Sequence, residues 1–169
     1  PNIRYRVTNC TTNESLSLLK NNDVDIAFVH SPVKNDFFTF HDCLTLEDFF
    51  VCSYDFDCSK IQTLEDLTKY RTLLLEKSSY SRKLLDANLL KYNIELHPKF
   101  ELASLDLLIE FAKKNMGIIC VSKQYIKKEL ENKELKIINL KEKLDLRAIS
   151  LAYDKENISN AAKRFVEFI

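Results

Sequence analysis

The chain has 169 residues, which is enough to bury a core either as one ordinary domain or as two small lobes. Its 25 basic and 25 acidic residues give zero formal net charge, and no basic stretch is interleaved with aromatic residues, so the sequence excludes the electrostatic footprint of a DNA-binding surface. No apolar run approaches the roughly 20 residues that a membrane span needs. Gly117 is the one glycine of the chain, so the sequence contains neither the phosphate-binding loop G-x-x-x-x-G-K-[ST] nor the dinucleotide-binding turn G-x-G-x-x-G. These features predict a soluble domain that binds neither DNA nor a membrane by itself.

The first part of the chain has the pattern of a strand, a helix and a second strand. Residues 3–8 (IRYRVT) alternate between apolar and polar, as in a half-buried strand. Thr11-x-x-Glu14 is a capping-box signature and predicts a helix that ends near Asn22. The apolar run over residues 24–29 (VDIAFV) then predicts a parallel strand that is buried on both faces.

The middle of the chain predicts a second unit of the same kind. Its expected elements are a strand over 49–54, a short helix capped by Thr63-x-x-Asp66, a strand over 71–76, a helix from Ser78–Ser81 to about Tyr92, a strand over 100–102, a helix capped by Ser104 and a buried strand over 117–121. Near the end, residues 144–153 predict a long strand, and Ser159 caps a last helix. Since long strands bracket the middle region, we expect the chain to leave one lobe and return to it through two crossovers that form a hinge.

The five cysteines favour free thiols over any covalent or metal framework. Their number is odd, their spacing is irregular, and they form neither a C-x-x-C pair nor a tight combination with histidine. The cysteines are Cys10, Cys43, Cys52, Cys58 and Cys120. This pattern is typical of a reducing cytoplasm and predicts no metal site. We also expect no cofactor. A redox role would require an exposed thiol of low pKa, which the sequence leaves open.

Four stretches, taken in order, resemble the effector-binding domain of LysR-type bacterial transcriptional regulators over essentially the whole chain. They are residues 1–27 (PNI through DVDIA), residues 64–67 (LEDL), residues 101–118 (ELAS through NMGI) and residues 158–165 (ISNAAKRF). The chain departs from the family at Asn22 and Asn115, where glycine is usual, and at Ser122, where proline is common. Asparagine tolerates a left-handed turn, so the first two departures are compatible with the fold.

The resemblance implies an α/β fold of the two-lobed, type 2 periplasmic-binding-protein-like kind. Each lobe would be a mixed sheet flanked by helices, and two crossover strands would join the lobes. Lobe I would comprise residues 1–53 and 147–169, without its first strand and helix, and lobe II residues 54–146. A DNA-binding helix-turn-helix would precede Pro1. We therefore expect a cytoplasmic homodimer or homotetramer that senses a small-molecule effector, contacts DNA only through the preceding domain and is not an enzyme.

The candidate ligand contacts lie where strands end and helices begin. In open α/β sheets a ligand binds at the carboxyl ends of strands, where helix N-termini present free N–H groups. The loops at these strand ends are rich in hydroxyl side chains, which suits a carboxylate or another small anion in the cleft between the lobes. They comprise residues 10–13, 28–33, 76–82 and 103–105. The predicted ligand-binding residues are Thr11, Thr12, Ser31, Ser104 and Leu105. Of these, Thr12 and Ser104 match family positions that often meet the effector, and capping a helix is the equally weighted alternative for each hydroxyl.

Other residues and functions have competing interpretations. Arg82 is favoured as a solvated arginine on a helix face over an ion-pair partner of an anionic effector. His30 is favoured as a loop residue with a backbone partner over a group that sets pH or ligand preference. A solute-binding protein of a transport system is the first alternative function. The second is an enzyme on the same scaffold, but no catalytic motif supports it.

Overall fold

The computed structural model describes residues 4–33 and 35–168, which form two compact units. Unit 1 comprises Pro1–Thr45 with Arg147–Ile169, and unit 2 comprises Leu46–Leu146. The chain therefore crosses between the units twice. The division into units falls at residues 46 and 147, where the sequence analysis placed the lobe boundaries at 54 and 147. Residues 48–53 belong to unit 2 because their strand pairs with two other strands of that unit.

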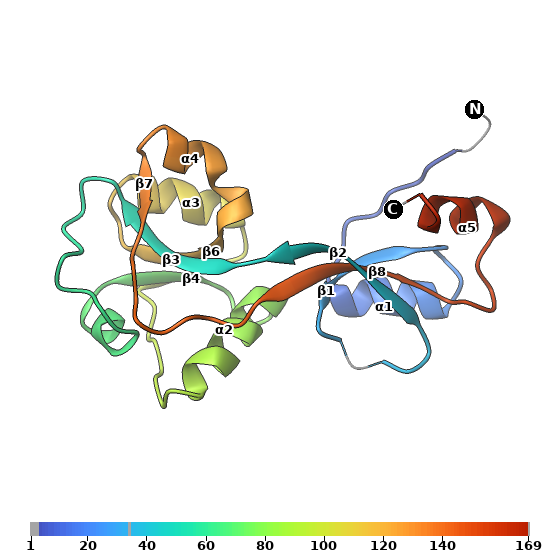
Figure 1. Ribbon diagram of the computed structural model, residues 1–169, viewed down its shortest axis with the longest axis horizontal. Coiled ribbons are helices and arrows are strands. Elements are labelled where there is room, and N and C mark those ends of the chain that lie inside the picture. Colours follow the sequence, from blue (N-terminus) through green and yellow to red (C-terminus); the bar gives the residue numbers. More distant parts are fainter. Residues whose placement is uncertain (1–3, 34, 169) are drawn as a thin grey trace. The chain divides into compact units, whose positions relative to one another are not determined.

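Unit 1 is a three-stranded sheet with a helix packed against it (Figure 1). Its elements are α1 (Thr12–Lys20), β1 (Ala27–Ser31), β2 (Thr39–Leu46), β8 (Arg147–Tyr153) and α5 (Asn160–Val166). The strand order is β1-β8-β2, and β1 runs antiparallel to β8 with Val29 opposite Ser150. The core of this unit joins α1 to the sheet through Leu19, Ala27, Val29 and Ala152.

The two faces of β1 differ, because successive side chains of a strand point to opposite sides. Ala27 and Val29 are buried in the core, whereas Phe28 is 51% exposed. The ring of Phe28 meets the ring of Phe165 from α5 edge to face, with centroids 6.5 Å apart. The prediction of a parallel strand buried on both faces was therefore wrong: β1 is antiparallel to its neighbour and is covered fully on one face only.

Residues 4–10 form no strand, although their alternation predicted one over 3–8. Tyr5 and Val7 are 74% and 91% exposed. A strand is stable only when its backbone groups pair with a neighbour, and neither sheet of the described residues includes this segment. The predicted first strand–helix–strand unit is therefore not formed in the described part of the chain; Ile3 lies outside it.

Unit 2 is a five-stranded mixed sheet in the order β5-β4-β6-β3-β7. Its elements are β3 (Asp48–Ser53), η1 (Glu65–Lys69), β4 (Thr72–Leu75), α2 (Tyr80–Leu90), β5 (Phe100–Leu102), α3 (Leu105–Lys113), β6 (Ile118–Ser122), η2 (Lys123–Tyr125), α4 (Lys127–Glu131) and β7 (Leu135–Ile137). Strand β4 is parallel to β5 and β6, while β3 is antiparallel to β6 and β7. The predicted strand–helix–strand unit is thus confirmed as β5, α3 and β6.

Both faces of this sheet are covered, with α2 on one side and α3 and α4 on the other (Figure 1). Phe50 and Leu74 belong to the hydrophobic cluster that contains α2 residues. Their sequence neighbours Val51 and Leu73 belong to the cluster that contains α3 residues. Because alternate side chains on both faces are buried, the strands are continuous apolar runs, which is the pattern that the sequence showed.

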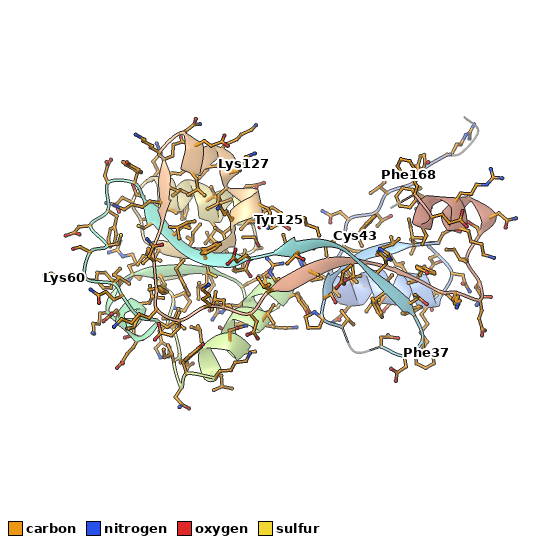
Figure 2. The ribbon with its side chains drawn as sticks, viewed as in Figure 1. Phe37, Cys43, Lys60, Tyr125, Lys127 and Phe168 are labelled. Atoms are coloured by element: carbon orange, nitrogen blue, oxygen red, sulfur yellow. The ribbon has the colours of Figure 1, made fainter. Side chains whose placement is uncertain are left out.

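Two strands were not predicted. Five of the eight side chains of β2 are exposed, among them Cys43 (Figure 2), and the strand mixes polar and apolar residues without a period of two. Strand β7 has three residues, which is too short for a periodic signal.

The predicted helix caps are confirmed. Thr11, Ser104 and Ser159 each accept a hydrogen bond from a backbone N–H in the first turn of the following helix. Asn22 and Asn115 have φ values of 60° and 58°, the left-handed conformation that was expected for positions where the family has glycine. The helix boundaries thus follow from local side-chain chemistry.

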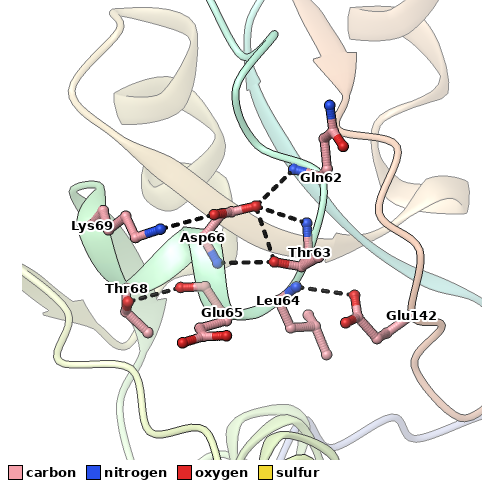
Figure 3. A network of polar contacts seen from close by, with 8 residues as sticks. All are labelled: Gln62, Thr63, Leu64, Glu65, Asp66, Thr68, Lys69 and Glu142. Atoms are coloured by element: carbon pink, nitrogen blue, oxygen red, sulfur yellow. Dashed lines mark hydrogen bonds and ion pairs between the residues drawn. The ribbon is translucent and has the colours of Figure 1, made fainter.

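The Thr63-x-x-Asp66 signature forms a polar network at the start of η1 (Figure 3). The Asp66 carboxylate accepts hydrogen bonds from the Thr63 hydroxyl at 2.9 Å, the backbone N–H of Gln62 at 3.1 Å and the Lys69 ammonium at 3.0 Å. These donors, Lys69 first, hold the pKa of Asp66 well below its ordinary value of 3.8. A depressed carboxyl pKa stabilises the fold above that ordinary value, and the contribution is lost as the pH falls below it.

We therefore expect Asp66→Asn to reduce the acid sensitivity of the domain. The difference in unfolding midpoint between about pH 6 and about pH 3 should be smaller in the variant, because asparagine has no carboxyl group to be protonated in this pH range. Thermal unfolding at both pH values measures this difference. The control is Asp55→Asn at an exposed carboxylate of the preceding loop, and an equal acid sensitivity of wild type and Asp66→Asn would contradict the expectation.

Candidate ligand-binding site

The hydroxyl of Thr11 is committed to capping α1. It accepts a hydrogen bond from the backbone N–H of Glu14 at 3.4 Å and donates to the Glu14 carboxylate at 2.8 Å. The same carboxylate accepts from the backbone N–H of Thr11, and these bonds lower the pKa of Glu14. A carboxylate beside the hydroxyl repels a second anion, so the geometry favours the capping interpretation for Thr11.

Thr12 is the first residue of α1, and its side chain is turned toward the sheet. It is buried, and its hydroxyl oxygen accepts a hydrogen bond from the backbone N–H of His30 at 3.3 Å. This bond joins the start of α1 to the carboxyl end of β1. Because the hydroxyl accepts here, its own hydrogen can be donated to a ligand.

His30 and Arg147 form a side-chain pair across β1 and β8. The Arg147 guanidinium nitrogen lies 2.9 Å from Nδ1 of His30, and Arg147 is only 4% exposed. A guanidinium has donors and no acceptor, so Nδ1 must accept and the ring proton of a neutral His30 must be on Nε2. His30 is therefore a strand residue whose backbone N–H donates to the Thr12 hydroxyl and whose ring pairs with Arg147, rather than the predicted loop residue with a backbone partner.

Thr12, His30 and Arg147 together are named the Arg147 cluster here. They come from α1, β1 and β8, and Thr12 is the first residue of a nine-residue helix, where the helix dipole is positive. Ser31 follows His30 and is partly buried opposite Ala148. A buried cation, a hydroxyl donor and a positive helix end favour a carboxylate or another small anion.

Arg147 was not singled out from the sequence. It falls inside a segment that was predicted as a long strand, and a charged residue in such a strand was the available signal. Its pairing with His30 depends on the register of β8 against β1, in which His30 stands opposite Ile149. That register is a long-range property.

In unit 2, Ser104 and Leu105 begin α3. The Ser104 hydroxyl is exposed and accepts a hydrogen bond from the backbone N–H of Leu107 at 3.3 Å, so it caps the helix. The side chain of Leu105 packs against the cluster under α3, so its backbone N–H is the group that is suited to a polar ligand contact. The structure thus brings Thr12 and Ser31 near one another in unit 1, and Ser104 and Leu105 together in unit 2.

Arg82 is buried, with an exposed fraction of 3%. The prediction of a solvated arginine on a helix face was therefore wrong. Its guanidinium donates to the Asp86 carboxylate at 2.8 Å, to the Glu101 carboxylate at 3.1 Å and to the carbonyl of Leu75 at 2.9 Å. Burial lowers the pKa of Arg82, but the hydrogen bonds to the two carboxylates outweigh it and raise the pKa. Arg82 is therefore a structural cation that ties α2 to β4 and β5.

The serines before α2 also have structural roles. Ser79 caps the helix by accepting from the backbone N–H of Arg82, and Ser78 donates to the Glu76 carboxylate at 2.6 Å. Ser79 is therefore the cap of α2, whereas Ser78 is bonded to a carboxylate of the preceding segment.

Three further features of the described residues concern pockets, metal ligands and membrane helices. A small hollow in unit 1 contains none of the predicted contacts; it is lined by Leu19, Asn22, Val24, Asp25, Asp154, Asn157 and Ile158. Within residues 4–33 and 35–168, no group of three His, Cys, Asp or Glu side chains is placed to hold a metal ion. No helix in the same ranges is both long enough and apolar enough to cross a membrane.

Comparison with known proteins identifies the family. All of residues 1–169 match the family described as the LysR substrate binding domain, and the chain belongs to that family, as its sequence resemblance indicated. No curated protein matches the sequence significantly. The predicted two-lobed, type 2 periplasmic-binding-protein-like fold is confirmed, because solved domains of this family superpose on nearly the whole chain.

Three solved structures show the extent of this similarity. The effector-binding domain of QuiR in complex with shikimate is 24% identical, with a TM-score of 0.78 over 94% of this chain and 76% of that one. The CcmR regulatory domain of Synechocystis PCC6803 in complex with 2-PG is 17% identical, with a TM-score of 0.81 over 94% and 77%. The regulatory domain of HypT from Salmonella typhimurium is 18% identical, with a TM-score of 0.82 over 99% and 81%. The family is one of transcriptional-regulator domains rather than of enzymes or transport proteins.

Proposed function

We propose that this domain binds a small anionic effector, such as a carboxylate, and thereby controls a LysR-type transcriptional regulator. The observation that carries the proposal is the Arg147 cluster, where the buried Arg147 guanidinium is bonded to the ring of His30 and the backbone N–H of His30 is bonded to the Thr12 hydroxyl at the start of α1. Ser31 in unit 1 and Ser104 and Leu105 in unit 2 are the further proposed contacts. The shikimate and 2-PG bound by two similar domains are both anions, which supports the same ligand class.

The expected affinity follows from the number of contacts. A hydrogen bond to a charged group contributes about 1.5–3 kcal/mol, and a helix N-terminus adds roughly 0.3–1 kcal/mol. Three or four such contacts, less the cost of ordering and desolvation, give a dissociation constant on the order of micromolar. This range suits a sensor that responds to metabolite concentration.

The remaining parts of the proposal concern the whole regulator. Effector binding would shift the population of two arrangements of a cytoplasmic homodimer or homotetramer, and a preceding helix-turn-helix domain would contact DNA. The domain itself would have no catalytic activity, so candidate effectors incubated with it should be recovered unchanged. Product formation during that incubation would contradict this part.

The test is a thermal-shift screen of small carboxylates, inorganic anions and uncharged compounds of similar size, followed by calorimetric titration of each hit. A ligand at 100 times its dissociation constant should add roughly 2.7 kcal/mol of stability. Thr12→Val keeps the shape of the side chain and removes its hydroxyl, so we expect about tenfold weaker binding, which corresponds to about 1.4 kcal/mol. Ser104→Ala should weaken binding to a similar or smaller extent.

The matched control is Ser159→Ala, which removes the cap of α5 outside the proposed contacts. It should lower stability and leave the affinity unchanged, since its hydroxyl has a capping role alone. The proposal fails if an anionic hit binds Thr12→Val and Ser104→Ala as tightly as wild type, or if the folded domain responds to uncharged compounds only.

A further inference from the structure

The segment that joins β7 to β8 lies on unit 2 without secondary structure of its own. Strand β7 ends at Ile137, and β8 begins at Arg147. Ile138 still follows the sheet, because its backbone N–H donates to the carbonyl of Phe50 at 2.9 Å. The next eight residues, 139–146, form neither helix nor strand and are named the strap here. All of them belong to unit 2.

The first half of the strap is fixed beside η1. The backbone N–H of Lys141 donates to the carbonyl of Gln62 at 2.9 Å. The Glu142 carboxylate accepts a hydrogen bond from the backbone N–H of Leu64 at 3.1 Å (Figure 3). Because Leu64 is fully buried, its N–H depends on this carboxylate for a partner while the strap is in place.

The second half of the strap is fixed on α2 by a buried amide. The backbone N–H of Asp145 donates to Oδ1 of Asn88 at 2.8 Å. Nδ2 of Asn88 donates to the carbonyl of Leu84 at 2.9 Å, and Asn88 is 3% exposed, so its amide is held in one orientation. Lys91 also forms an ion pair with Asp145, but both side chains are 54% exposed, so this pair contributes little.

The strap has fewer buried apolar contacts than the sheet beneath it. Five of its eight residues are exposed. Leu140 and Leu144 pack against the hydrophobic cluster that contains α2 residues, and both are only partly buried. A segment held by a few polar contacts opens at a lower free energy than a core strand. The polar contacts of Glu142 and Asn88 are therefore the main anchors of the strap.

The anchors also set the length of free chain between the two units. On the outward path, β2 ends at Leu46 and β3 begins at Asp48, so one residue connects them. On the return path, one residue lies between the anchored Asp145 and the start of β8 at Arg147. Each connection is therefore a single residue as long as the strap is in place.

We propose that the strap is a conformational device that opens independently of the rest of unit 2 and so lengthens the return connection between the units from one residue to eight. With the strap closed, two single-residue connections restrain the motion of one unit against the other. With the strap open, only the outward connection is short, and the return connection behaves as a flexible linker. The inference is independent of the proposed effector contacts, because the anchors involve neither α1 nor the start of α3.

Amide hydrogen exchange followed by NMR tests the opening. The reporters are the amides of Leu64, Lys141 and Asp145, which bond to or from the strap, and the amide of Ile118, which donates to the carbonyl of Arg71 in the sheet at 2.9 Å. In the wild-type domain the three strap reporters should exchange faster than Ile118 and depend less on urea, as expected for a local opening. In Asn88→Ala all three should exchange about tenfold faster than in wild type, because one anchoring hydrogen bond is lost.

The matched control is Lys91→Ala, which removes the exposed ion pair to the same strap residue. It should change the exchange of the three reporters by less than about twofold. Two results would overturn the opening: exchange of the strap reporters with the same rate and urea dependence as Ile118 in wild type, or acceleration of Asp145 alone in Asn88→Ala.

Backbone NMR relaxation of the double variant Asn88→Ala/Glu142→Ala tests the link to the motion of the units. With both anchors removed, we expect each unit to tumble with a shorter rotational correlation time than in wild type or in Lys91→Ala. The amide spectrum of unit 2 shows that the double variant is folded. Correlation times equal to those of wild type, in a double variant whose strap amides exchange freely, would overturn the role of the strap in restraining the units.

Discussion

Replacing Arg82 with methionine is expected to destabilise the domain by about 3 kcal/mol, because it removes a buried cation and leaves its partners unpaired. Arg82 is 3% exposed and donates to two carboxylates and to the carbonyl of Leu75. The side chains of Asp86 and Glu101 are 45% and 39% exposed, so water compensates part of the loss. The carbonyl of Leu75 would also lose this donor.

Thermal and urea unfolding measure this effect. For a chain of this length about 3 kcal/mol corresponds to a fall in melting temperature of about 10 °C. Arg82→Lys should recover part of the loss, because an ammonium keeps the charge but lacks the planar set of donors. Lys69→Met is the control: its ion pair with Asp66 involves a side chain that is 68% exposed, so a much smaller change is expected. A melting temperature of Arg82→Met equal to that of wild type would show that the buried cation is dispensable.

The second large effect is expected for Gly117→Ala, which should cost about 2–3 kcal/mol through steric overlap. A Cβ atom at this position would lie 2.7 Å from the backbone carbonyl oxygen of Arg71 and 3.1 Å from Cγ of Leu73. The carbonyl of Arg71 cannot retreat without breaking its hydrogen bond from the N–H of Ile118 at 2.9 Å. The only glycine of the chain is therefore required by the close approach of β4 and β6, rather than by an unusual backbone angle.

The control for this substitution is Asn115→Gly in the same connection. Asn115 has a φ of 58°, a conformation that glycine adopts without strain, so the variant should be close to wild type in stability. Urea unfolding of both variants gives the comparison. If Gly117→Ala were as stable as Asn115→Gly, the strands would have to separate freely at this point, and the steric argument would be wrong.

Much of this fold was determined by the sequence alone, because the signals are local. The caps at Thr11, Ser104 and Ser159 follow from side-chain oxygens placed before amphipathic helices. The strands of unit 2 follow from short apolar runs, which are required when both faces of a sheet are covered. The family could also be recognised from the sequence, since four local stretches stand in the order of its effector-binding domain.

Only the tertiary structure decided which residues meet. Thr12, His30 and Arg147 are joined by the register of β1 against β8 and by the packing of α1, and no local pattern encodes either. The ion pair of Arg82, which belongs to α2, depends likewise on Glu101 from β5. Residues 4–10 show the converse, since their alternation predicted a strand but neither sheet of the described residues includes them. Strand pairing and buried ion pairs are long-range, so they depend on the arrangement of the chain in space rather than on the residues nearby in sequence.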